Sequence, residues 1–290
     1  MPELPEVETT VNGLKEKVLE RTFLDVWSDW HKLIKKPKSF ELFKNQIKNK
    51  KIIKIWRRAK NIIFDLSDGY SLLVHQKMTG HLLCGKWILK DGEWAPAIQG
   101  PLSDPYNRFL HLVFFLDDGE MMALSDARKF AKVELQKTED LLNSEDFKNL
   151  GPEPLEDSFT ILKLKEILKN KKGKIKQVLM DQKIIAGIGN IYASEILWWS
   201  KIHPERTVQT LNDDELDLLY KYIKKVLTLG VELGGESFSD YRKPDGSKGN
   251  FDSERVTYKR ENQKCNRCGE KIKRITLGGR GTFFCPSCQK

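Results

Sequence analysis

Four of the five cysteines stand close together near the end of the chain, as two Cys-x-x-Cys pairs separated by sixteen residues. Each pair can place two thiolates on one turn, and two such turns complete a tetrahedron around zinc. No histidine accompanies the cluster, so nothing indicates an open coordination position for catalysis. We therefore predict one structural zinc ion, held by Cys265, Cys268, Cys285 and Cys288.

Three segments suit contact with phosphate. Between the cysteine pairs, loose alternation around Gly278-Gly279-Arg280-Gly281 predicts a zinc-braced β-hairpin with Arg280 at its tip, although spacing alone favours an ordinary surface arginine there. Residues 32–60 carry twelve Lys/Arg against the single acid Glu41, a surplus that phosphate contacts explain better than a solvated face. Gly187-Ile188-Gly189-Asn190 precedes a predicted helix and suits either an anion site or a plain tight turn.

The first residues offer nucleophilic chemistry. Removal of Met1 would leave Pro2 with a free α-amine, whose pKa near ~7.7–8.0 keeps a useful neutral fraction at pH 7. Attack of a secondary amine on a sugar C1′ gives a cationic iminium, an electron sink for eliminating phosphates. Glu3 is then a candidate proton donor to the departing base or the opened sugar. On these residues alone, an ordinary N-terminus is the simpler interpretation.

The elements that position these residues fall into two halves. Residues 5–19 predict a helix, because apolar side chains recur on one face after an acidic first turn. β-rich runs over 52–66 and 70–74 flank Ser67-Asp68-Gly69, and runs over 112–116 and 121–124 flank Asp117-Asp118-Gly119, so each predicts a hairpin. We predict an α+β multidomain protein in which residues 1–135 form a β-sandwich with a leading helix, followed by a linker over 136–150.

The second half is helical. A Pro/Gly cluster at 151–154 marks the boundary, and helices are predicted over 159–168, 175–180, 191–199 and 213–229, the last with an Asn212/Glu215 capping box. Residues 234–250 are rich in Gly, Ser and Asp and predict a mobile loop. We assign residues 151–249 to a helical domain that includes this loop, and 250–290 to the zinc hairpin.

Composition narrows the class of protein. The 290 residues carry a formal charge of +9 and 39% hydrophobic residues, which excludes a fully disordered chain and suits a polyanionic partner. No apolar run approaches the ~18 residues that a membrane helix needs, and the first residues do not form a secretory signal. We expect a cytoplasmic protein with reduced cysteines.

Ordered blocks of a distinctive kind run along nearly the whole chain. The first is Pro2-Glu3-Leu4-Pro5-Glu6-Val7-Glu8-Thr9. It is followed by Arg57-Arg58-Ala59-Lys60, His75-x-x-Met78-x-Gly80, Asp126-Ala127-Arg128-Lys129-Phe130, residues 150–155, Met180-Asp181-Gln182, residues 187–195, Ile202-His203-Pro204 and residues 278–289. In these blocks and their order, the chain resembles the bacterial formamidopyrimidine-DNA glycosylases.

This resemblance implies a β-sandwich, a helix–two-turn–helix domain and a zinc hairpin, in a monomer that binds double-stranded DNA. It implies excision of oxidised purines, such as 8-oxoguanine and formamidopyrimidines, followed by strand cleavage through β,δ-elimination. Pro2 would be the Schiff-base nucleophile and Glu3 the principal acid, while Lys60 and Arg280 would grip phosphate and assist elimination.

The resemblance also implies DNA contacts. Met78, Arg128 and Phe130 would fill the space left by a flipped nucleotide, with Arg128 facing the orphan cytosine. The loop over 236–250 would close over the flipped purine. Further contacts are implied for His75, Lys171, Asn190 and Tyr258.

The chain departs from the family pattern in places. Phe109 stands where the family often has a DNA-contacting histidine, with His111 two positions on, and Ala131 replaces a usual glycine. Residues 85–107 are longer than expected and are interpreted as a surface insertion. Two alternatives stay open: an endonuclease VIII-like enzyme that prefers oxidised pyrimidines, and a non-catalytic DNA-binding relative. Leu4 and the void-filling trio favour the purine enzyme over the first. The second is opposed by four intact residues, namely Pro2, Glu3, Lys60 and Arg280.

Overall fold

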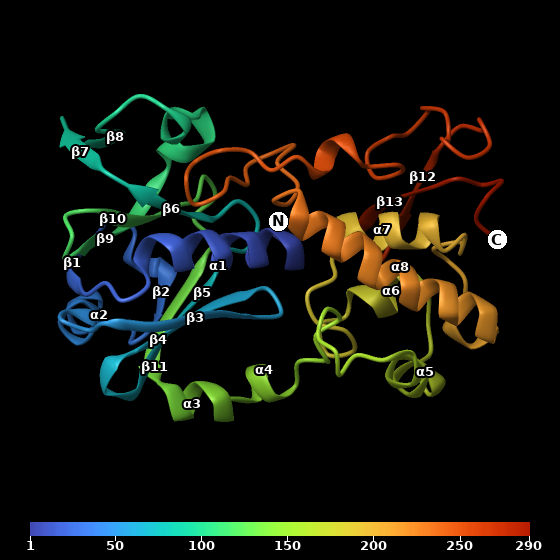
Figure 1. Cartoon of the computed structure of the whole chain (residues 1–290), viewed down its shortest axis with the longest axis horizontal. Helices are drawn as coiled ribbons and strands as arrows, with labels where there is room; N and C mark the ends of the chain where they lie inside the picture. The colour runs from blue at the N-terminus through green and yellow to red at the C-terminus, as the bar shows by residue number, and fades with distance from the viewer. The chain divides into compact units, whose positions relative to one another are not determined.

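The computed structural model describes all 290 residues, and they divide into two compact units. The first consists of Met1–Lys148 with Leu233–Asp252, and the second of Asn149–Glu232 with Ser253–Lys290 (Figure 1). None of the helices is both long and apolar enough to cross a membrane.

The first unit is the predicted β-sandwich. One sheet has the strand order β1 (Phe23–Ser28), β9 (Leu110–Leu116), β10 (Met121–Ser125) and β6 (His81–Gly85). The other has the order β2 (Ile34–Lys36), β11 (Lys132–Lys137), β5 (Tyr70–His75), β4 (Asn61–Leu66) and β3 (Ile52–Arg58). Apart from the parallel β11–β2 pair, neighbouring strands run antiparallel, so both predicted hairpins, β4–β5 and β9–β10, are confirmed.

Two helices close the core of this unit. Helix α1 (Leu4–Val18) buries Val7, Val11 and Leu14 among the inward side chains of both sheets. Helix α2 (Phe40–Ile47) adds Phe43, and Ser39 caps its first turn by accepting the Leu42 amide. The predicted leading helix is therefore confirmed, and its apolar stripe fixes which of its faces points inward.

The run over 52–66 is not one strand, as the sequence suggested. It breaks at Ala59 and Lys60 into β3 and β4, which pair with each other as a hairpin. Ala59 takes a left-handed conformation (φ 52°) that the sequence does not announce, since the turn lacks the Gly or Asn that normally marks such a position. The break matters because it places Lys60 on a turn instead of within a strand.

Two connecting segments are more structured than expected. The linker over 136–150 contains α3 (Thr138–Asn143) and α4 (Glu145–Lys148), and Leu141 packs with Ile63 and Leu73. The insertion over 85–107 forms a two-stranded hairpin, β7 (Trp87–Lys90) with β8 (Glu93–Pro96), and then two 3-10 turns, η3 (Pro101–Ser103) and η4 (Pro105–Arg108).

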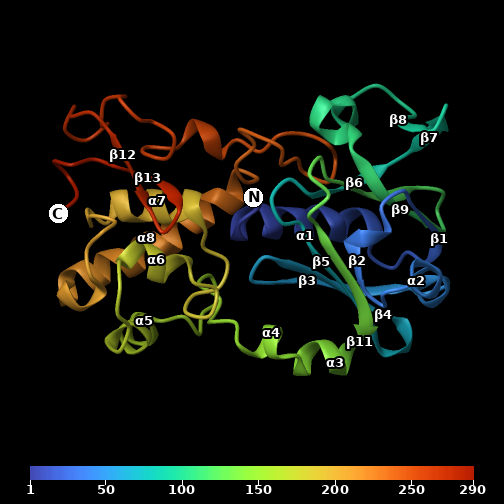
Figure 2. The same cartoon turned by 180° about the vertical axis from the view of Figure 1, so that it is seen from behind.

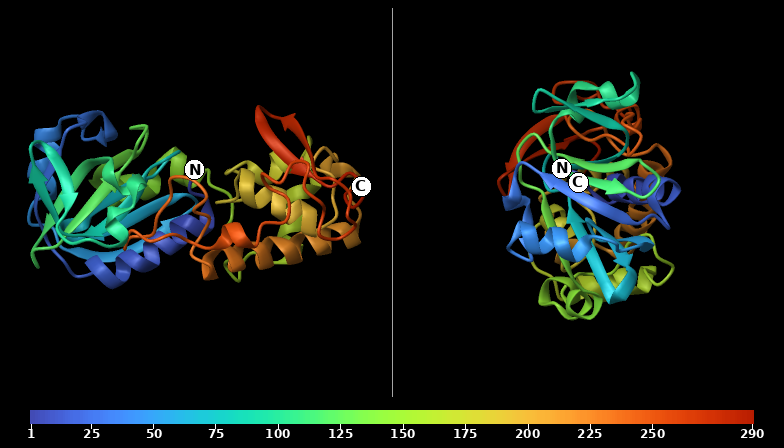
Figure 3. Two further views of the ribbon diagram at one scale, coloured as in Figure 1. Left: turned by 90° about the horizontal axis from the view of Figure 1, so that it is seen from above. Right: turned by 90° about the vertical axis from the view of Figure 1, so that its left-hand side faces the viewer.

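The second unit is helical, as predicted, with α5 (Ile161–Lys169), α6 (Ile175–Met180), α7 (Asn190–Trp199) and α8 (Asp213–Glu232). The capping box of α8 is confirmed: the Asn212 amide donates to Glu215 and the Glu215 amide donates to Asn212, both at 2.9 Å. The chain ends in a hairpin of β12 (Lys273–Leu277) and β13 (Arg280–Phe284), and β13 packs against α7 (Figure 3).

The loop over 233–252 belongs to a different unit from the one that the sequence predicted. We assigned its residues up to 249 to the helical domain and the rest to the zinc hairpin, but its contacts group it with the β-sandwich unit. It is free of helix and strand up to Phe251, as expected for a loop. Its hydrogen bonds to α1, β6 and the insertion explain the grouping.

Candidate functional site

The N-terminal segment is held by one carboxylate. Pro2 and Glu3 are buried where α1 begins, and Glu3 occupies the N-cap position. The Glu3 amide donates to Glu6 Oε2 at 2.7 Å, while Glu6 Oε1 accepts the Glu236 amide at 2.8 Å. Glu6 thus joins the predicted nucleophile and acid to the start of the loop over 233–252. The sequence indicated Glu6 only as a favourable charge at the helix N-terminus.

The Lys60 turn is tied to the same helix. Arg57 Nε lies 2.6 Å from Glu8 Oε2, and Arg57 Nη1 donates to the Ala59 carbonyl at 3.0 Å. The Arg57 side chain is only 7% exposed, so this ion pair is strongly shielded from solvent. Because Glu8 lies on α1, the pair fixes the β3–β4 turn, and with it the 6%-exposed Lys60, relative to Glu3.

His75 lies at the end of β5, opposite Asn61, the residue after Lys60. Burial, together with the nearby charges of Lys77, Lys60 and Lys132, lowers the pKa of His75 to about 3. Its Nδ1 accepts the Lys77 amide at 3.0 Å, so Nε2 carries the proton. His75 is therefore a neutral hydrogen-bond donor at neutral pH and carries no positive charge.

The three predicted void-filling residues share one patch of the first unit. Asp126, fully buried, accepts the amides of Arg128, Phe130 and Ala131, at 3.2, 2.7 and 2.7 Å respectively, and also accepts the Thr79 hydroxyl. This carboxylate shapes the loop after β10 and fastens it to the loop that carries Met78. Met78, at 42%, Phe130, at 52%, and Arg128 are exposed in that patch, and the Arg128 guanidinium lies 4.6 Å from the Phe130 ring centre.

Two of the departures have structural explanations. Ala131 does not take a positive φ, so the position makes no demand for glycine. His111 bonds through Nδ1 to Asp29 at 2.8 Å and is only 9% exposed. His111 therefore does not replace the DNA-contacting histidine that the family often has at the position of Phe109.

In the second unit, Asn190 and the Arg280 turn are directly connected. Gln182 holds the glycine turn before α7 by donating to the Ile188 carbonyl and accepting the Gly187 amide, both at 2.8 Å. Asn190 then opens α7 and donates to the Gly281 carbonyl at 3.1 Å. The structure brings these two predicted phosphate contacts, one on a helix and one on the zinc hairpin, into one place.

The hairpin also rests on a buried lysine. Lys176, 1% exposed on α6, donates to the Thr282 hydroxyl at 2.7 Å. A Cβ on Gly278 would lie 2.7 Å from the side-chain nitrogen Nε2 of Gln177, so the hairpin turn lies against α6. Arg280 itself is exposed at the start of β13. Lys171 lies on the segment before α6, half-buried.

A second buried carboxylate positions Tyr258. Glu195 on α7 is 1% exposed and accepts the amides of Val256, Thr257 and Tyr258 at 2.8, 3.1 and 2.7 Å. Burial raises the pKa of Glu195, and the three backbone amides oppose that rise. The Tyr258 ring packs edge-on against Phe283 at 5.3 Å, so the segment that enters the zinc hairpin is fixed to α7.

The four predicted cysteines meet as a metal site. Their sulfur atoms lie within 4.8 Å of one another, with 3.5 Å between Cys268 and Cys285 and 4.0 Å between Cys265 and Cys288. Zn–S bonds of ~2.3 Å in a tetrahedron require sulfur–sulfur separations of about 3.8 Å, so the set fits one structural zinc ion. Cys84 lies apart on β6, where burial raises the pKa of its thiol to about 12.

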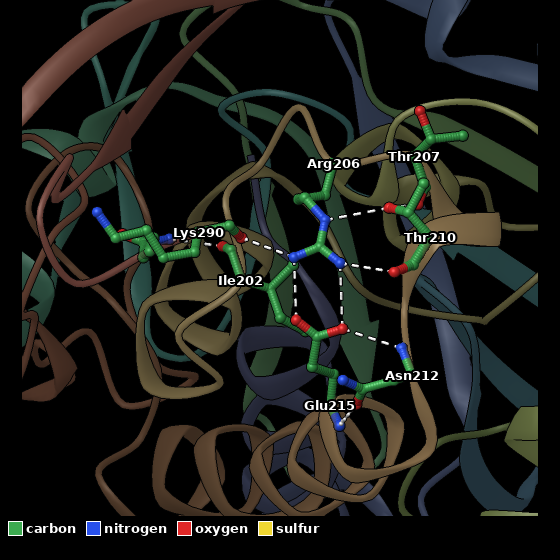
Figure 4. Close-up of polar contacts among 8 residues, drawn as sticks. Ile202, Arg206, Thr207, Thr210, Asn212, Glu215 and Lys290 are labelled. Atoms are coloured by element: carbon green, nitrogen blue, oxygen red, sulfur yellow. Dashed lines mark hydrogen bonds and ion pairs between the residues drawn. The ribbon is translucent and has the colours of Figure 1, made fainter.

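The zinc hairpin is anchored to the helices through Arg206 (Figure 4). Its guanidinium makes a bidentate pair with Glu215, at 2.9 and 3.1 Å, and donates to the Lys290 carbonyl at 3.0 Å. Glu215 is also the capping residue of α8, so one side chain couples the start of that helix to the last residue of the chain.

Three family models match the chain. The formamidopyrimidine-DNA glycosylase N-terminal domain matches residues 1–133, the formamidopyrimidine-DNA glycosylase H2TH domain matches residues 150–242, and a zinc finger found in FPG and IleRS matches residues 262–290. Together they reproduce the predicted order of a sandwich, a helical domain and a zinc hairpin.

Similar proteins cover the chain from end to end. It is 39% identical over 290 residues to the formamidopyrimidine-DNA glycosylase of Pelotomaculum thermopropionicum, covering 100% of this chain and 99% of the relative. It is 37% identical to that of Pediococcus pentosaceus, with 100% and 99% covered. A solved complex between the Lactococcus lactis Fpg and DNA containing an abasic site is 33% identical, with a TM-score of 0.86 and 99% of each chain covered. Another, with DNA containing an N7-benzyl-Fapy-dG, has a TM-score of 0.85 at 33% identity and covers 100% of both chains.

Proposed function

Because this chain belongs to the formamidopyrimidine-DNA glycosylase family and is a base excision repair glycosylase, we propose that it removes oxidised purines through a Pro2 Schiff base. Its substrates are 8-oxoguanine and ring-opened formamidopyrimidines in double-stranded DNA. It then cleaves the strand at the resulting abasic site by β,δ-elimination.

The proposed chemistry begins once Met1 is removed. The Pro2 nitrogen attacks C1′ of the damaged nucleotide and gives up its own proton, while the bond from C1′ to the base breaks. One proton goes to the departing base and one to the ring oxygen as the sugar opens, Glu3 supplying one of the two, and an iminium then joins Pro2 to C1′. The iminium then withdraws electrons while a proton leaves C2′ and the 3′ phosphate departs. A second elimination releases the 5′ phosphate, and water hydrolyses the iminium to free Pro2.

The observation that carries this proposal is the bracing of the N-terminal segment. Glu6 holds the Glu3 backbone, and the Glu8–Arg57 pair holds the Lys60 turn on the same helix. A buried nucleophile and acid at the start of a helix that also holds a lysine turn suit a sugar whose phosphate must be gripped while C1′ is attacked. An ordinary N-terminus has no need of two such braces.

The remaining residues divide between phosphate and base in this proposal. Asn190 and Arg280, joined through Gly281, grip the backbone, with contributions from Lys171 and Tyr258. Arg128 reads the orphan cytosine with its fork of donors, Phe130 wedges the stack, and Met78 fills the vacated space. The zinc ion supplies no chemistry to the reaction and braces the hairpin that carries Arg280.

Borohydride trapping on a duplex with one 8-oxoguanine opposite cytosine tests the nucleophile. The wild type should form a covalent adduct, and Pro2→Gly should form less, because a primary amine remains but reacts more slowly. A protein whose N-terminus is blocked by an added residue is the matched control and should form none. Robust trapping by the blocked protein would overturn the assignment of Pro2.

A second arm separates the substrate classes. Cleavage of otherwise identical duplexes that carry 8-oxoguanine or an oxidised pyrimidine should favour the purine. A preference for the pyrimidine would replace the proposal with an endonuclease VIII-like specificity.

A further inference from the structure

The insertion over 85–107 contacts the loop over 233–252. Its exposed β7–β8 hairpin is followed by η3 and η4, and these two turns lie beside that loop, as Figures 1 and 2 show from opposite sides. Both segments belong to the first unit. The insertion is therefore more than the surface appendage that its sequence suggests.

Arg242 is the centre of the contact. Its side chain is 1% exposed, and its Nη2 lies 3.0 Å from Asp104 Oδ1. Its Nη1 donates to the carbonyls of Ser239 and Tyr241 at 2.7 and 2.8 Å, and its guanidinium lies 4.6 Å from the Tyr106 ring centre. A guanidinium this buried is costly unless its charge is matched, and here the matching charge comes from the insertion.

The environment of Asp104 keeps its carboxylate ionised opposite Arg242. It is the N-cap of η4 and accepts the Tyr106 amide at 3.0 Å. Partial burial alone would raise the pKa of Asp104, but its bonds to Arg242 and to the Tyr106 amide outweigh burial and lower it. The carboxylate therefore stays ionised at neutral pH and opposes the buried charge of Arg242.

A second contact lies one residue beyond Tyr106, the aromatic partner of Arg242. Asn107, 1% exposed, donates to the carbonyls of Pro101 and Gly246 at 2.9 and 3.1 Å, and its Oδ1 lies 3.0 Å from His81 Nε2. Gly246 has φ +86°, and a Cβ there would lie 2.7 Å from the Leu102 amide nitrogen. The loop backbone and η3 are thus in direct contact, with no room for a side chain between them.

The other end of the loop is fixed separately. Glu6 accepts the Glu236 amide through its carboxylate and the Tyr241 hydroxyl, at 3.0 Å, through its carbonyl. Between Glu236 and Tyr241 lies a short tip, residues 237–240, whose Phe238 is 57% exposed. The N-terminal helix therefore contacts both ends of the tip, and the insertion, through Arg242, fixes the end at Tyr241 as well.

We propose that residues 101–107 of the insertion are a positioning element for the lesion loop, in which Asp104 acts through Arg242 to hold the tip over an extruded base. The link to an extruded base rests on the proposed function, whereas the anchoring rests on the contacts above. Asp104 and Arg242 are positioning residues and touch no reacting atom. Their loss should impair steps that require a base in the pocket and spare steps that do not.

Asp104→Asn tests the proposal, with Asp91→Asn as the matched control. Asp91 is exposed at the β7–β8 turn with φ 52°, a conformation that Asn tolerates. Three readouts are needed: single-turnover excision of 8-oxoguanine, cleavage of a duplex with a preformed abasic site, and the rate at which trypsin cuts after Lys248, followed by mass spectrometry.

Asp104→Asn should slow excision by roughly tenfold or more while abasic-site cleavage stays within about twofold of the wild type. Trypsin should cut after Lys248 faster than in Asp91→Asn, which should match the wild type in all three readouts. Equal slowing of excision and abasic-site cleavage would overturn the proposal, because the element would then merely stabilise the sandwich. Unchanged excision and proteolysis would overturn it as well.

Two further outcomes remain decisive. If Asp104→Asn does not fold, the double variant Asp104→Asn with Arg242→Met removes both charges, and the same split between excision and abasic-site cleavage is expected of it. If the wild type excises no purine but Asp104→Asn still exposes Lys248 to trypsin, the anchoring is supported and the proposed function is what fails.

Discussion

Replacing Glu6 by Gln removes one acceptor and almost no volume. The Glu6 carboxylate receives two buried backbone amides, one from Glu3 at 2.7 Å and one from Glu236 at 2.8 Å, through different oxygens. A glutamine has one carbonyl oxygen, so one of the two amides would face an NH₂ group instead. Losing a charge-assisted bond and leaving a buried donor unsatisfied costs about 1.5–3 kcal/mol. If that free energy is lost from the stabilisation of the transition state, the rate falls about tenfold to a hundredfold.

Single-turnover excision of 8-oxoguanine and cleavage of a preformed abasic site measure this cost. Both should fall in Glu6→Gln, because the amide of Glu3 lies beside the nucleophile that both steps use. Glu16→Gln, on the exposed face of the same helix, is the control and should behave as the wild type. Wild-type rates in both assays would refute the role of Glu6. A loss confined to excision would show that Glu6 acts through the loop alone, as proposed for Asp104.

Three further predictions concern the metal, the orphan base and acid stability. Chelation should release one zinc per chain and abolish strand cleavage, because the Arg280 turn loses its brace. Metal analysis of the control variant Cys84→Ser should still find one zinc per chain. Metal-free protein that remains fully active would contradict this prediction. Cleavage of 8-oxoguanine duplexes with each of the four opposite bases compares Arg128 with Lys60. Arg128→Ala should reduce the preference for opposite cytosine by about 1–3 kcal/mol, whereas Lys60→Ala should slow cleavage of all four duplexes alike. The reverse pattern would exchange the roles of the two residues. The unfolded chain protonates His75 near pH 6.5 but the folded chain only near pH 3, so stability should fall as the pH drops below 6.5, by about 1–2 kcal/mol at pH 5. Between pH 7 and pH 5, the melting temperature of His75→Gln should therefore fall less than that of the wild type. An equal fall would mean that the imidazole of the folded wild type is not held neutral.

The features that short stretches of sequence specify were predicted well. The four zinc ligands follow from spacing, because each Cys-x-x-Cys pair closes its own turn before any long-range contact forms. The start of α8 follows from Asn212 and Glu215, whose side chains satisfy the amides of the same turn. The hairpin turns Ser67-Asp68-Gly69 and Asp117-Asp118-Gly119 carry the turn chemistry in their own residues. Local geometry sufficed in each case.

Only the tertiary structure decided how the candidate site is braced. Ala59 is an ordinary residue in a left-handed turn, and its conformation depends on pairing between β3 and β4 and on Arg57. The partnership of Glu6 with Glu236, and that of Arg242 with Asp104, join segments far apart in the chain. A sequence pattern shows that such residues carry charge, but whether the charge is solvated or buried against a partner depends on which segments pack together. The chemical groups of this enzyme can therefore be identified from its sequence. Their positions depend on buried ion pairs and hydrogen bonds that form only once the chain has folded.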